Sequence, residues 1–186
     1  MFASLLLRDS RATAATAAIA ARPGMGTAIS MLPVPCIFCD VRSEKGFRIV
    51  FEDDELVVFT DINPASSHHL QVVPKNHIDN VRSLCIEDVA LVRRMKAAGN
   101  KALDMLGVPS SPDSRRLGFH IPPYISIGHL HMHVQGLPFK SMFRGWRYPV
   151  RTGNGRTTTK GFSMFADVDQ TLSILESGGR VKIGSC

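Results

Sequence analysis

Short β-rich runs separated by turn residues make up the first part of the chain that carries a folding pattern. Phe47–Phe51 and Leu56–Phe59 flank the acidic turn 52–54, and this arrangement predicts a β-hairpin. Residues 69–73 predict a third strand, which ends at Pro74 because proline has no backbone N–H to donate to a sheet. We expect these strands to be antiparallel.

A single long helix is predicted after these strands. Apolar residues recur at helical spacing over 86–106, and Gly107 follows as a stop signal. Short strands are then predicted at 117–120 and 129–136, and a short helix at 167–176. Together these elements predict an α+β fold: a five-stranded antiparallel sheet, one long helix packed on a face of it, and a short C-terminal element.

The length of the chain fits one domain with tails. Its 186 residues, 44% of them hydrophobic, are enough for one sizeable core. We expect a leader at 1–33, one domain at 34–150, and an extension at 151–186 that packs on this domain. No run reaches the ~18 apolar residues that cross a bilayer, so no membrane partner is expected. The formal charge of +6 favours a phosphate-bearing ligand, and ordinary solubility or a basic targeting segment explains it equally well.

The N-terminal composition leaves the compartment open. Residues 1–30 are rich in Ala, Ser and Thr, carry Arg8, Arg11 and Arg22, and contain a single acid, Asp9. This is typical of a mitochondrial transit peptide, but a disordered leader or an upstream start with internal initiation fits as well. We therefore expect the cytoplasm or nucleus, or the mitochondrion if the leader is a transit peptide. Four cysteines are too few for a disulfide scaffold and favour a reducing compartment.

Three histidines at a spacing of two give the clearest chemical signal: His129, His131 and His133. Side chains alternate along a strand, so the three imidazoles share one face while the apolar residues between them point to the other. Three protonated imidazoles this close would repel one another. Neighbouring groups must therefore hold some of them neutral and fix their tautomers, as a nucleophile or a metal ligand requires.

The pattern His-hydrophobic-His-hydrophobic-His resembles the signature of the histidine-triad (HIT) family of nucleotide hydrolases and transferases. Phe51–Asp54, Phe59–Pro64 and His69–Ile78 stand in the order expected upstream of it. Gly118–Pro123 resembles the branch that holds the third histidine-triad nucleotide-binding protein and aprataxin. The likeness covers about 35–138 and implies a HIT-like fold. The sequence departs from many members at Gly118, where they carry an Asn near the phosphate.

The resemblance implies a catalytic role for four side chains. His131 would attack the α-phosphorus and form a transient nucleotidyl-histidine, while its Nδ1 proton is donated to the backbone carbonyl of His129. His133 and His69 would donate to phosphate oxygens or to the leaving group, and Ser126 would add a hydroxyl to the same oxygens.

The resemblance also implies a nucleotide pocket, to which Ser126 and His133 belong as well. Asp61 would bind the ribose hydroxyls, and Phe59 and Ile62 would form apolar walls around the base. Without the resemblance, Asp61 is better explained as a turn residue. His120 precedes the triad on a short strand, where a site role and a structural role stay equally open.

A second candidate site begins at Cys36 and Cys39. The Cys-x-x-Cys spacing lets two thiolates hold one tetrahedral ion, although the pair alone also fits a redox-active or a simply buried pair. The resemblance implies that His77 and His129 complete a Cys2His2 zinc site. Such a closed site would be structural, pinning the N-terminal segment to the catalytic strand.

These features favour a hydrolase that cleaves nucleoside phosphoramidates or acyl-adenylate-like conjugates of a purine nucleotide. The resemblance also implies a homodimer that pairs the helices and central strands of two copies. A second hypothesis is an aprataxin-like enzyme that removes adenylate from nucleic-acid ends. Its phosphate and base contacts would come from a basic, aromatic set: Arg144, Trp146, Arg147, Tyr148 and Arg151. A non-catalytic nucleotide sensor is a third hypothesis, which the presence of His131 and its supporting residues disfavours.

Overall fold

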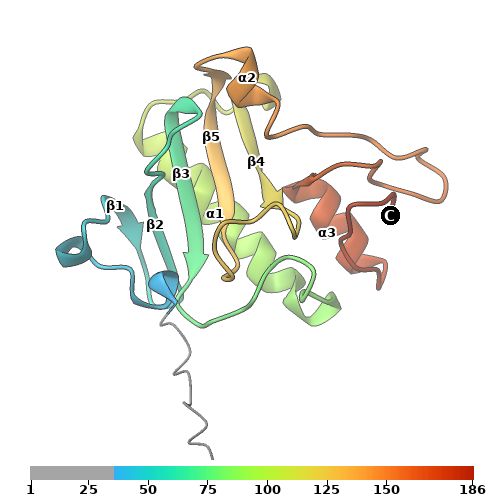
Figure 1. The fold of residues 1–186 in the computed structure, drawn as a ribbon, viewed down its shortest axis with the longest axis horizontal. Coiled ribbons are helices and arrows are strands. Elements are labelled where there is room, and N and C mark those ends of the chain that lie inside the picture. The colour runs from blue at the N-terminus through green and yellow to red at the C-terminus, as the bar shows by residue number, and fades with distance from the viewer. Residues whose placement is uncertain (1–35) are drawn as a thin grey trace, which may run out of the picture. The chain divides into compact units, whose positions relative to one another are not determined.

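The computed structural model describes residues 36–186, in which helices pack on a β-sheet. The predicted leader, 1–33, lies outside the described residues, so its nature stays a prediction. Six antiparallel strands form one sheet in the order β1-β2-β3-β5-β4-β6 (Figure 1). The strands are β1 Ile49–Glu52, β2 Leu56–Thr60, β3 Ser66–Pro74, β4 Arg115–His120, β5 Met132–Phe139 and β6 Phe165–Asp167.

The two longer helices cover one face of this sheet. The long helix α1 Val89–Met105 crosses it, α3 Val168–Glu176 lies beside α1, and the short α2 Met142–Gly145 follows β5 (Figure 1). Four short 3-10 turns complete the list of elements: Ile37–Asp40, Ser43–Lys45, Ile86–Asp88 and Pro112–Ser114. Within the described residues, no helix is both long enough and apolar enough to cross a membrane.

The hairpin forms where the sequence predicts it. β1 and β2 pair antiparallel, and the side chain of Asp53 closes the turn between them. Its Oδ1 accepts the backbone N–H groups of Glu55 at 2.9 Å and Leu56 at 2.7 Å. The acidic turn residue therefore satisfies donors that the sheet leaves free at this end of the hairpin.

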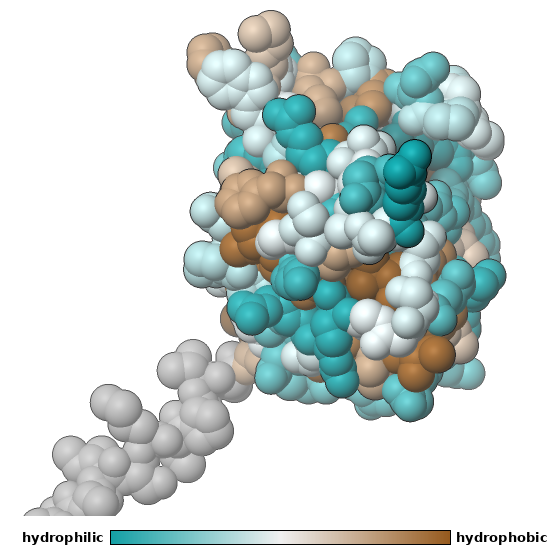
Figure 2. All heavy atoms as spheres, turned by 90° about the vertical axis from the view of Figure 1, so that its right-hand side faces the viewer, coloured by the Kyte–Doolittle hydropathy of each residue, from teal (hydrophilic) through white to brown (hydrophobic). Residues whose placement is uncertain are grey.

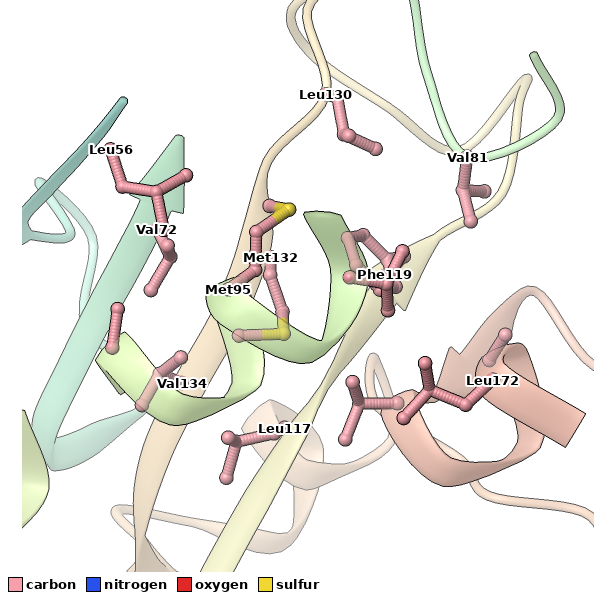
Figure 3. Close-up of a cluster of buried hydrophobic side chains, with 14 of the residues drawn as sticks. Leu56, Val72, Val81, Met95, Leu117, Phe119, Leu130, Met132, Val134 and Leu172 are labelled. Carbon is pink, nitrogen blue, oxygen red and sulfur yellow. The ribbon is translucent and has the colours of Figure 1, made fainter. Parts of the chain in front are cut away.

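The core lies between the sheet and the two longer helices. Met132 and Val134 of β5 are fully buried against Met95 of α1, and Leu172 of α3 joins the same cluster beside β4 (Figure 3). Gly99 allows α1 to come this close, because a Cβ at that position would lie 2.7 Å from a methyl group of Val134. Close packing of this kind fixes the position of β5 relative to α1, and β5 carries the histidine segment.

The α+β fold is confirmed, and two details of the prediction are corrected. The sheet has six strands rather than five, because Phe165–Asp167 adds β6 to the edge of β4. Three residues are too few to show an alternating pattern, so this strand exists only through its pairing. The predicted strand 129–136 begins at Met132, and α2 was not predicted from sequence. His129 and His131 therefore precede the hydrogen-bonded part of β5.

β6 also explains the glycine at position 118. Gly118 pairs with Asp167, and a Cβ at Gly118 would collide with the backbone carbonyl of Ala166 and meet the Phe165 ring at 2.7 Å. A side chain at position 118 and a strand in the place of β6 exclude each other.

Replacing Gly118 by Ala is therefore expected to lower the free energy of unfolding by about 1–3 kcal/mol, because β6 must move to admit the methyl group. Urea denaturation measures the change. Gly128→Ala is the matched control, since a Cβ at Gly128 meets no atom within 4 Å. Equal stability of the two variants would contradict the close approach of β6.

Candidate active site and metal centre

Every histidine except His68 belongs to one of two side-chain clusters, which meet at the segment 129–133. The alternation predicted for this segment continues although the strand itself starts later. Leu130, like Met132 and Val134, is buried in the core, and the three histidines point to the opposite side. The apolar residues therefore anchor the segment and leave the imidazoles for chemistry.

Three imidazoles form a continuous hydrogen-bonded chain across β3, β5 and β4. Nε2 of His69 lies 3.0 Å from Nδ1 of His133, and Nε2 of His133 lies 3.1 Å from Nδ1 of His120. Backbone groups close both ends. The N–H of Ala65 donates to Nδ1 of His69 at 3.0 Å, and Nε2 of His120 donates to the carbonyl oxygen of Arg147 at 2.7 Å.

These end groups determine the tautomer of each ring. The Arg147 carbonyl can only accept, so His120 carries its proton on Nε2 and accepts from His133 at Nδ1. The same logic places the proton of His133 on Nε2, and that of His69 as well. The Ala65 N–H, which can only donate, requires an unprotonated Nδ1 on His69. All three imidazoles are then neutral, and every hydrogen bond in the chain points the same way.

Burial supports this neutral state. It lowers the pKa of His69 to about 4, although the Asp61 carboxylate acts in the opposite direction. Burial also lowers the pKa of His120, and lowers that of His133 well below its usual value, where the neighbouring His131 adds repulsion. Desolvation is the first cause in each case because it disfavours the charged imidazolium.

His131 is held in the orientation that a nucleophile needs. Its Nδ1 donates to the backbone carbonyl of His129 at 2.7 Å, which leaves the lone pair of Nε2 free. Burial lowers the pKa of His131, against the opposing effect of this hydrogen bond. The ring of Phe38 packs edge-on against His131 with 5.5 Å between centroids. The ring is therefore fixed by one backbone acceptor and one aromatic neighbour.

Asp61 lies next to the histidine chain. Its Oδ2 is 3.5 Å from Nε2 of His69 and 3.7 Å from Nδ1 of His133. Oδ1 accepts the backbone N–H of Asn63 and Oδ2 accepts the side-chain amide of Gln71, each at 2.7 Å. The carboxylate is thus both the turn residue that the pattern alone indicates and a group of the site that the resemblance implies.

The other predicted pocket residues are placed unequally. Phe59 is buried and packs edge-on against Phe38, with 5.4 Å between ring centroids. Ile62 is fully exposed. Ser126 lies exposed in the loop before the triad, and no hydrogen bond among the described residues joins it to a histidine. The structure therefore brings Phe59 to His131 through Phe38, but leaves Ile62 and Ser126 outside the packed cluster.

Three contributors to the site were not assigned from sequence. His120 ends the imidazole chain. As an isolated histidine on a short strand, it gave no sequence signal that separates a site role from a structural one. Tyr148 is buried among the rings of His69, His120 and His133, with centroid distances of 5.0–5.6 Å. Burial raises its pKa to about 12, so the hydroxyl stays protonated. Phe38 lies between the two cysteines of the Cys-x-x-Cys pair, and its aromatic character there was the only available signal.

The second cluster contains the four residues predicted as metal ligands. The ligand atoms of Cys36, Cys39, His77 and His129 all lie within 4.8 Å of one another. Sγ of Cys39 is 3.2 Å from Nδ1 of His77 and 3.5 Å from Nδ1 of His129, and Sγ of Cys36 is 3.4 Å from Nδ1 of His129. These separations are close to the edges of a tetrahedron with metal–sulfur bonds of ~2.3 Å and metal–nitrogen bonds of ~2.0 Å.

The hydrogen bonds around this cluster orient both imidazoles. Nε2 of His129 lies 2.9 Å from the carbonyl oxygen of Pro74, and Nε2 of His77 lies 3.2 Å from Oδ1 of Asp79. Each ring therefore carries its proton on Nε2 and turns the lone pair of Nδ1 toward the thiols. The cluster can hold a metal ion, and its donor set of two sulfurs and two nitrogens suits a tetrahedral one.

The neutral histidine chain makes stability depend on pH. An unfolded chain has a histidine pKa near 6.5, whereas burial lowers the pKa of His69 to about 4. The unfolded chain therefore binds more protons between these two values. His69 contributes its full stabilisation above pH ~6.5 and loses it as the pH falls through ~4, on the order of 3 kcal/mol in all.

Replacing His69 by Gln is expected to flatten this decline, because glutamine does not titrate. Urea denaturation at about pH 7.5 and about pH 5 measures it, with His68→Gln as the control outside the cluster. If the His69 variant loses as much stability on acidification as the wild type, His69 is not the origin of the decline.

The comparisons agree with this geometry. Residues 35–148 match the family described as "Scavenger mRNA decapping enzyme C-term binding". Adenosine 5′-monophosphoramidase HINT3 of Danio rerio is 40% identical over 145 residues, which cover 77% of this chain and 83% of the relative. Aprataxin of Danio rerio is 27% identical over 138 residues, which cover 72% of this chain but 38% of aprataxin.

A solved structure supports the fold. The HIT family hydrolase of Legionella pneumophila is 26% identical, with a TM-score of 0.52, and the match covers 59% of this chain and 99% of that one. Residues 35–148, which match the family, contain the strands β1–β5, the long helix α1 and all three triad histidines. By its sequence, its fold and the arrangement of these histidines, the chain belongs to the histidine-triad family.

Proposed function

We propose that the protein is a hydrolase that cleaves nucleotide conjugates at the α-phosphorus, with a nucleoside phosphoramidate or an acyl adenylate as substrate. One observation carries the proposal: the buried His131 has its Nδ1 proton fixed by the His129 carbonyl and its Nε2 lone pair free. The relative from Danio rerio is named an adenosine 5′-monophosphoramidase, which supports the phosphoramidate as substrate class.

The reaction proceeds in two displacements at phosphorus. In the first, Nε2 of His131 bonds to the α-phosphorus, the bond from phosphorus to the leaving nitrogen or oxygen breaks, and the leaving group takes up a proton from solvent. In the second, water bonds to phosphorus and gives up a proton to solvent, the Nε2–phosphorus bond breaks and the nucleotide is released. His131 becomes cationic on attack, and the His129 carbonyl stabilises it through the Nδ1–H hydrogen bond.

The imidazole chain limits how His133 and His69 can assist. The N–H of His69 is directed at His133, and the N–H of His133 is directed at His120. A phosphate oxygen must therefore take over one of these N–H groups to receive a hydrogen bond. Because the Ala65 N–H and the Arg147 carbonyl close the chain, no proton enters it from either end, and the chain orients His69 and His133 as hydrogen-bond donors without relaying protons. Ser126, exposed on the loop before the triad, would reach the phosphate only from the solvent side.

The nucleotide pocket is proposed on the side of His131 where Phe38 and Phe59 pack. Both rings are buried, so they would form the apolar floor of a pocket beside the nucleophile, against which the edge of a purine base can pack. Asp61 retains lone pairs that can accept hydrogen bonds from the ribose hydroxyls, and the exposed Ile62 can close over the base. A homodimer that pairs the helices and central strands, and the compartment in which the protein works, stay predictions.

Replacing His131 by Ala is expected to reduce AMP release from adenosine 5′-phosphoramidate by about a thousandfold or more, because no other group supplies the nucleophile. Binding of AMP should change far less, since the alanine leaves the pocket walls in place. Turnover assays and calorimetry measure the two quantities. His68→Ala is the matched control. Undiminished turnover in the His131 variant would sink the proposed mechanism.

Removal of adenylate from nucleic-acid ends is the second candidate. Phe143 and Trp146 are both largely exposed, pack edge-on with 5.0 Å between centroids, and stand beside Arg144 and Arg147. This basic, aromatic surface suits a single strand. Tyr148, which the sequence placed in the same set, is buried and cannot stack on a base. Arg144 is already hydrogen-bonded to Asn63 at 2.7 Å.

A competition between substrates separates the two candidates. Wild-type protein is assayed for AMP release from adenosine 5′-phosphoramidate and from a 5′-adenylated DNA nick, at low and at physiological salt. Preference for the phosphoramidate supports the proposed function. Preference for the nick, with steep salt dependence, favours the second candidate, because phosphate contacts release counterions.

We propose that the metal at the Cys2His2 cluster is a structural zinc ion. The cluster uses two thiols and two imidazoles and leaves no ligand position open, which suits a structural site. Bound zinc would supply the positive charge that holds the thiols as thiolates. Without it, burial and, as a smaller effect, the neighbouring Cys36 raise the pKa of Cys39. Cys36, Cys39 and His77 would then be tied to His129, two residues before the nucleophile.

Purified protein is accordingly expected to carry about one zinc ion per chain. The double change Cys36→Ser and Cys39→Ser should abolish this content and lower the melting temperature, since the ligands then lose their common ion. Elemental analysis and thermal unfolding measure both effects. Cys85→Ser, outside the cluster, is the control. Wild-type melting behaviour in the double variant would contradict a structural metal.

A further inference from the structure

Residues 151–186 are built into the edge of the sheet next to the histidine chain. β6 pairs with β4, so that His120 lies opposite Phe165, and the backbone N–H of Ile121 donates to the carbonyl of Met164 at 2.9 Å. The Phe165 ring packs against both His120 and Tyr148. The extension therefore contacts the end of the imidazole chain directly.

The outer surface of this region is mixed in character. Figure 2 looks onto the side of Figure 1 that carries α3 and the C-terminal residues, and it shows hydrophilic and hydrophobic residues interspersed. The region thus has an exterior of mixed character and an interior that faces β4. Its interior contains one charged group that the proposed mechanism does not use.

That group is Lys160, which has no exposed surface. Its ammonium lies within hydrogen-bond distance of four backbone carbonyl oxygens: those of Gly161 at 2.9 Å, Ser163 at 3.0 Å, Lys182 at 3.0 Å and Ile183 at 3.2 Å. Because an ammonium has three N–H groups, at least one of them is shared between two of these acceptors. A buried charge is costly unless it is satisfied in this way. The lysine therefore joins two stretches of the extension, 161–163 and 182–183, around one point.

Ser163 connects this point to the active site. Its carbonyl accepts from Lys160, and its hydroxyl donates to the carbonyl of Pro149 at 2.7 Å and accepts from the N–H of Phe165 at 3.2 Å. Pro149 is two residues after Arg147, whose carbonyl accepts the proton of His120. A short path therefore connects the lysine to that carbonyl: two hydrogen bonds lead from Lys160 through Ser163 to Pro149, and two residues of backbone lead from Pro149 to Arg147.

We propose that Lys160 and Ser163 are positioning residues of the active site, which fix the Arg147 carbonyl and thereby the tautomer of His120 and of the imidazole chain behind it. The tautomers are independent of any activity, and only the kinetic consequence rests on the proposed hydrolase function. A lysine that served the extension alone would leave the histidines unchanged when it is replaced.

The carbonyl matters because, among residues 36–186, it is the one group that accepts a hydrogen bond from Nε2 of His120. If it moves away, Nε2 of His120 loses its partner, both tautomers become populated, and the direction of the hydrogen bonds is no longer set. Water that enters the gap would also relieve the desolvation of the chain. The charged and titratable groups in and around the chain are Asp61, His69, His120, His131, His133, Lys140, Arg144, Arg147 and Tyr148.

The first test observes the rings themselves. Full-length, zinc-replete protein is labelled with ¹⁵N at histidine, and the ring tautomers and titration curves are recorded by NMR for wild type, Ser163→Ala and Lys160→Met. Wild type should show His120 and His133 with the proton on Nε2. Both variants should show mixed tautomers for these rings and a titration midpoint shifted upward, toward the ordinary histidine value.

Ser163→Ala guards against a folding defect, because it cuts the path while leaving Lys160 and its four carbonyls in place. Lys182→Met is the matched control for the lysine change, since the Lys182 side chain is exposed. Wild-type tautomers in a folded Ser163→Ala protein would overturn the proposal, whatever the outcome for Lys160→Met. Altered tautomers in the control would overturn it as well.

The second test is kinetic. The two variants should lose roughly tenfold to a hundredfold in kcat for adenosine 5′-phosphoramidate, with little change in KM, and the acid limb of the pH–rate profile should move to higher pH. An unchanged acid limb would overturn the proposal. If wild type itself shows no turnover, the proposed function has failed, and the NMR result decides the positioning role alone.

Discussion

The site depends on the directional hydrogen-bonded chain of three neutral imidazoles. Rings of this kind have two tautomers, so an isolated pair such as His69 and His133 would have no defined polarity. Polarity is imposed by the backbone at both ends, through the Ala65 N–H, which can only donate, and the Arg147 carbonyl, which can only accept. Burial then keeps the rings neutral, because an imidazolium would be desolvated.

The fold supplies these end groups from opposite parts of the chain. Ala65 lies just before β3 in the first half of the domain, and Arg147 follows α2 beyond the last triad residue. The imidazoles come from β3, β5 and β4, which are neighbours in the sheet although β4 precedes β5 in the sequence. The order of the strands in the sheet therefore aligns the three imidazoles, and α1 packs on the other face of the sheet through Met95 and Gly99.

The sequence was enough to predict the fold class, the long helix and the side of the triad segment that faces the core, because these follow from local periodicity. The metal cluster and His131 needed the family resemblance, since spacing alone cannot join Cys36 to His129. What neither source predicted depends on pairing between distant segments. β6 is three residues long, His120 is a lone histidine, and Tyr148 was assigned to a nucleic-acid surface although it is buried.

Gly118 explains why β6 and His120 occur together. It and His120 lie on the same face of β4, because side chains alternate along a strand. β6 pairs with the edge of β4 at position 118, where a Cβ would collide with the Ala166 carbonyl, and the Phe165 ring of the same strand packs on the His120 ring. An amide side chain such as the Asn of many family members is thus excluded by the extension itself. The polar group that this face of β4 contributes is instead an imidazole two residues further on, oriented by a carbonyl that the extension holds in place.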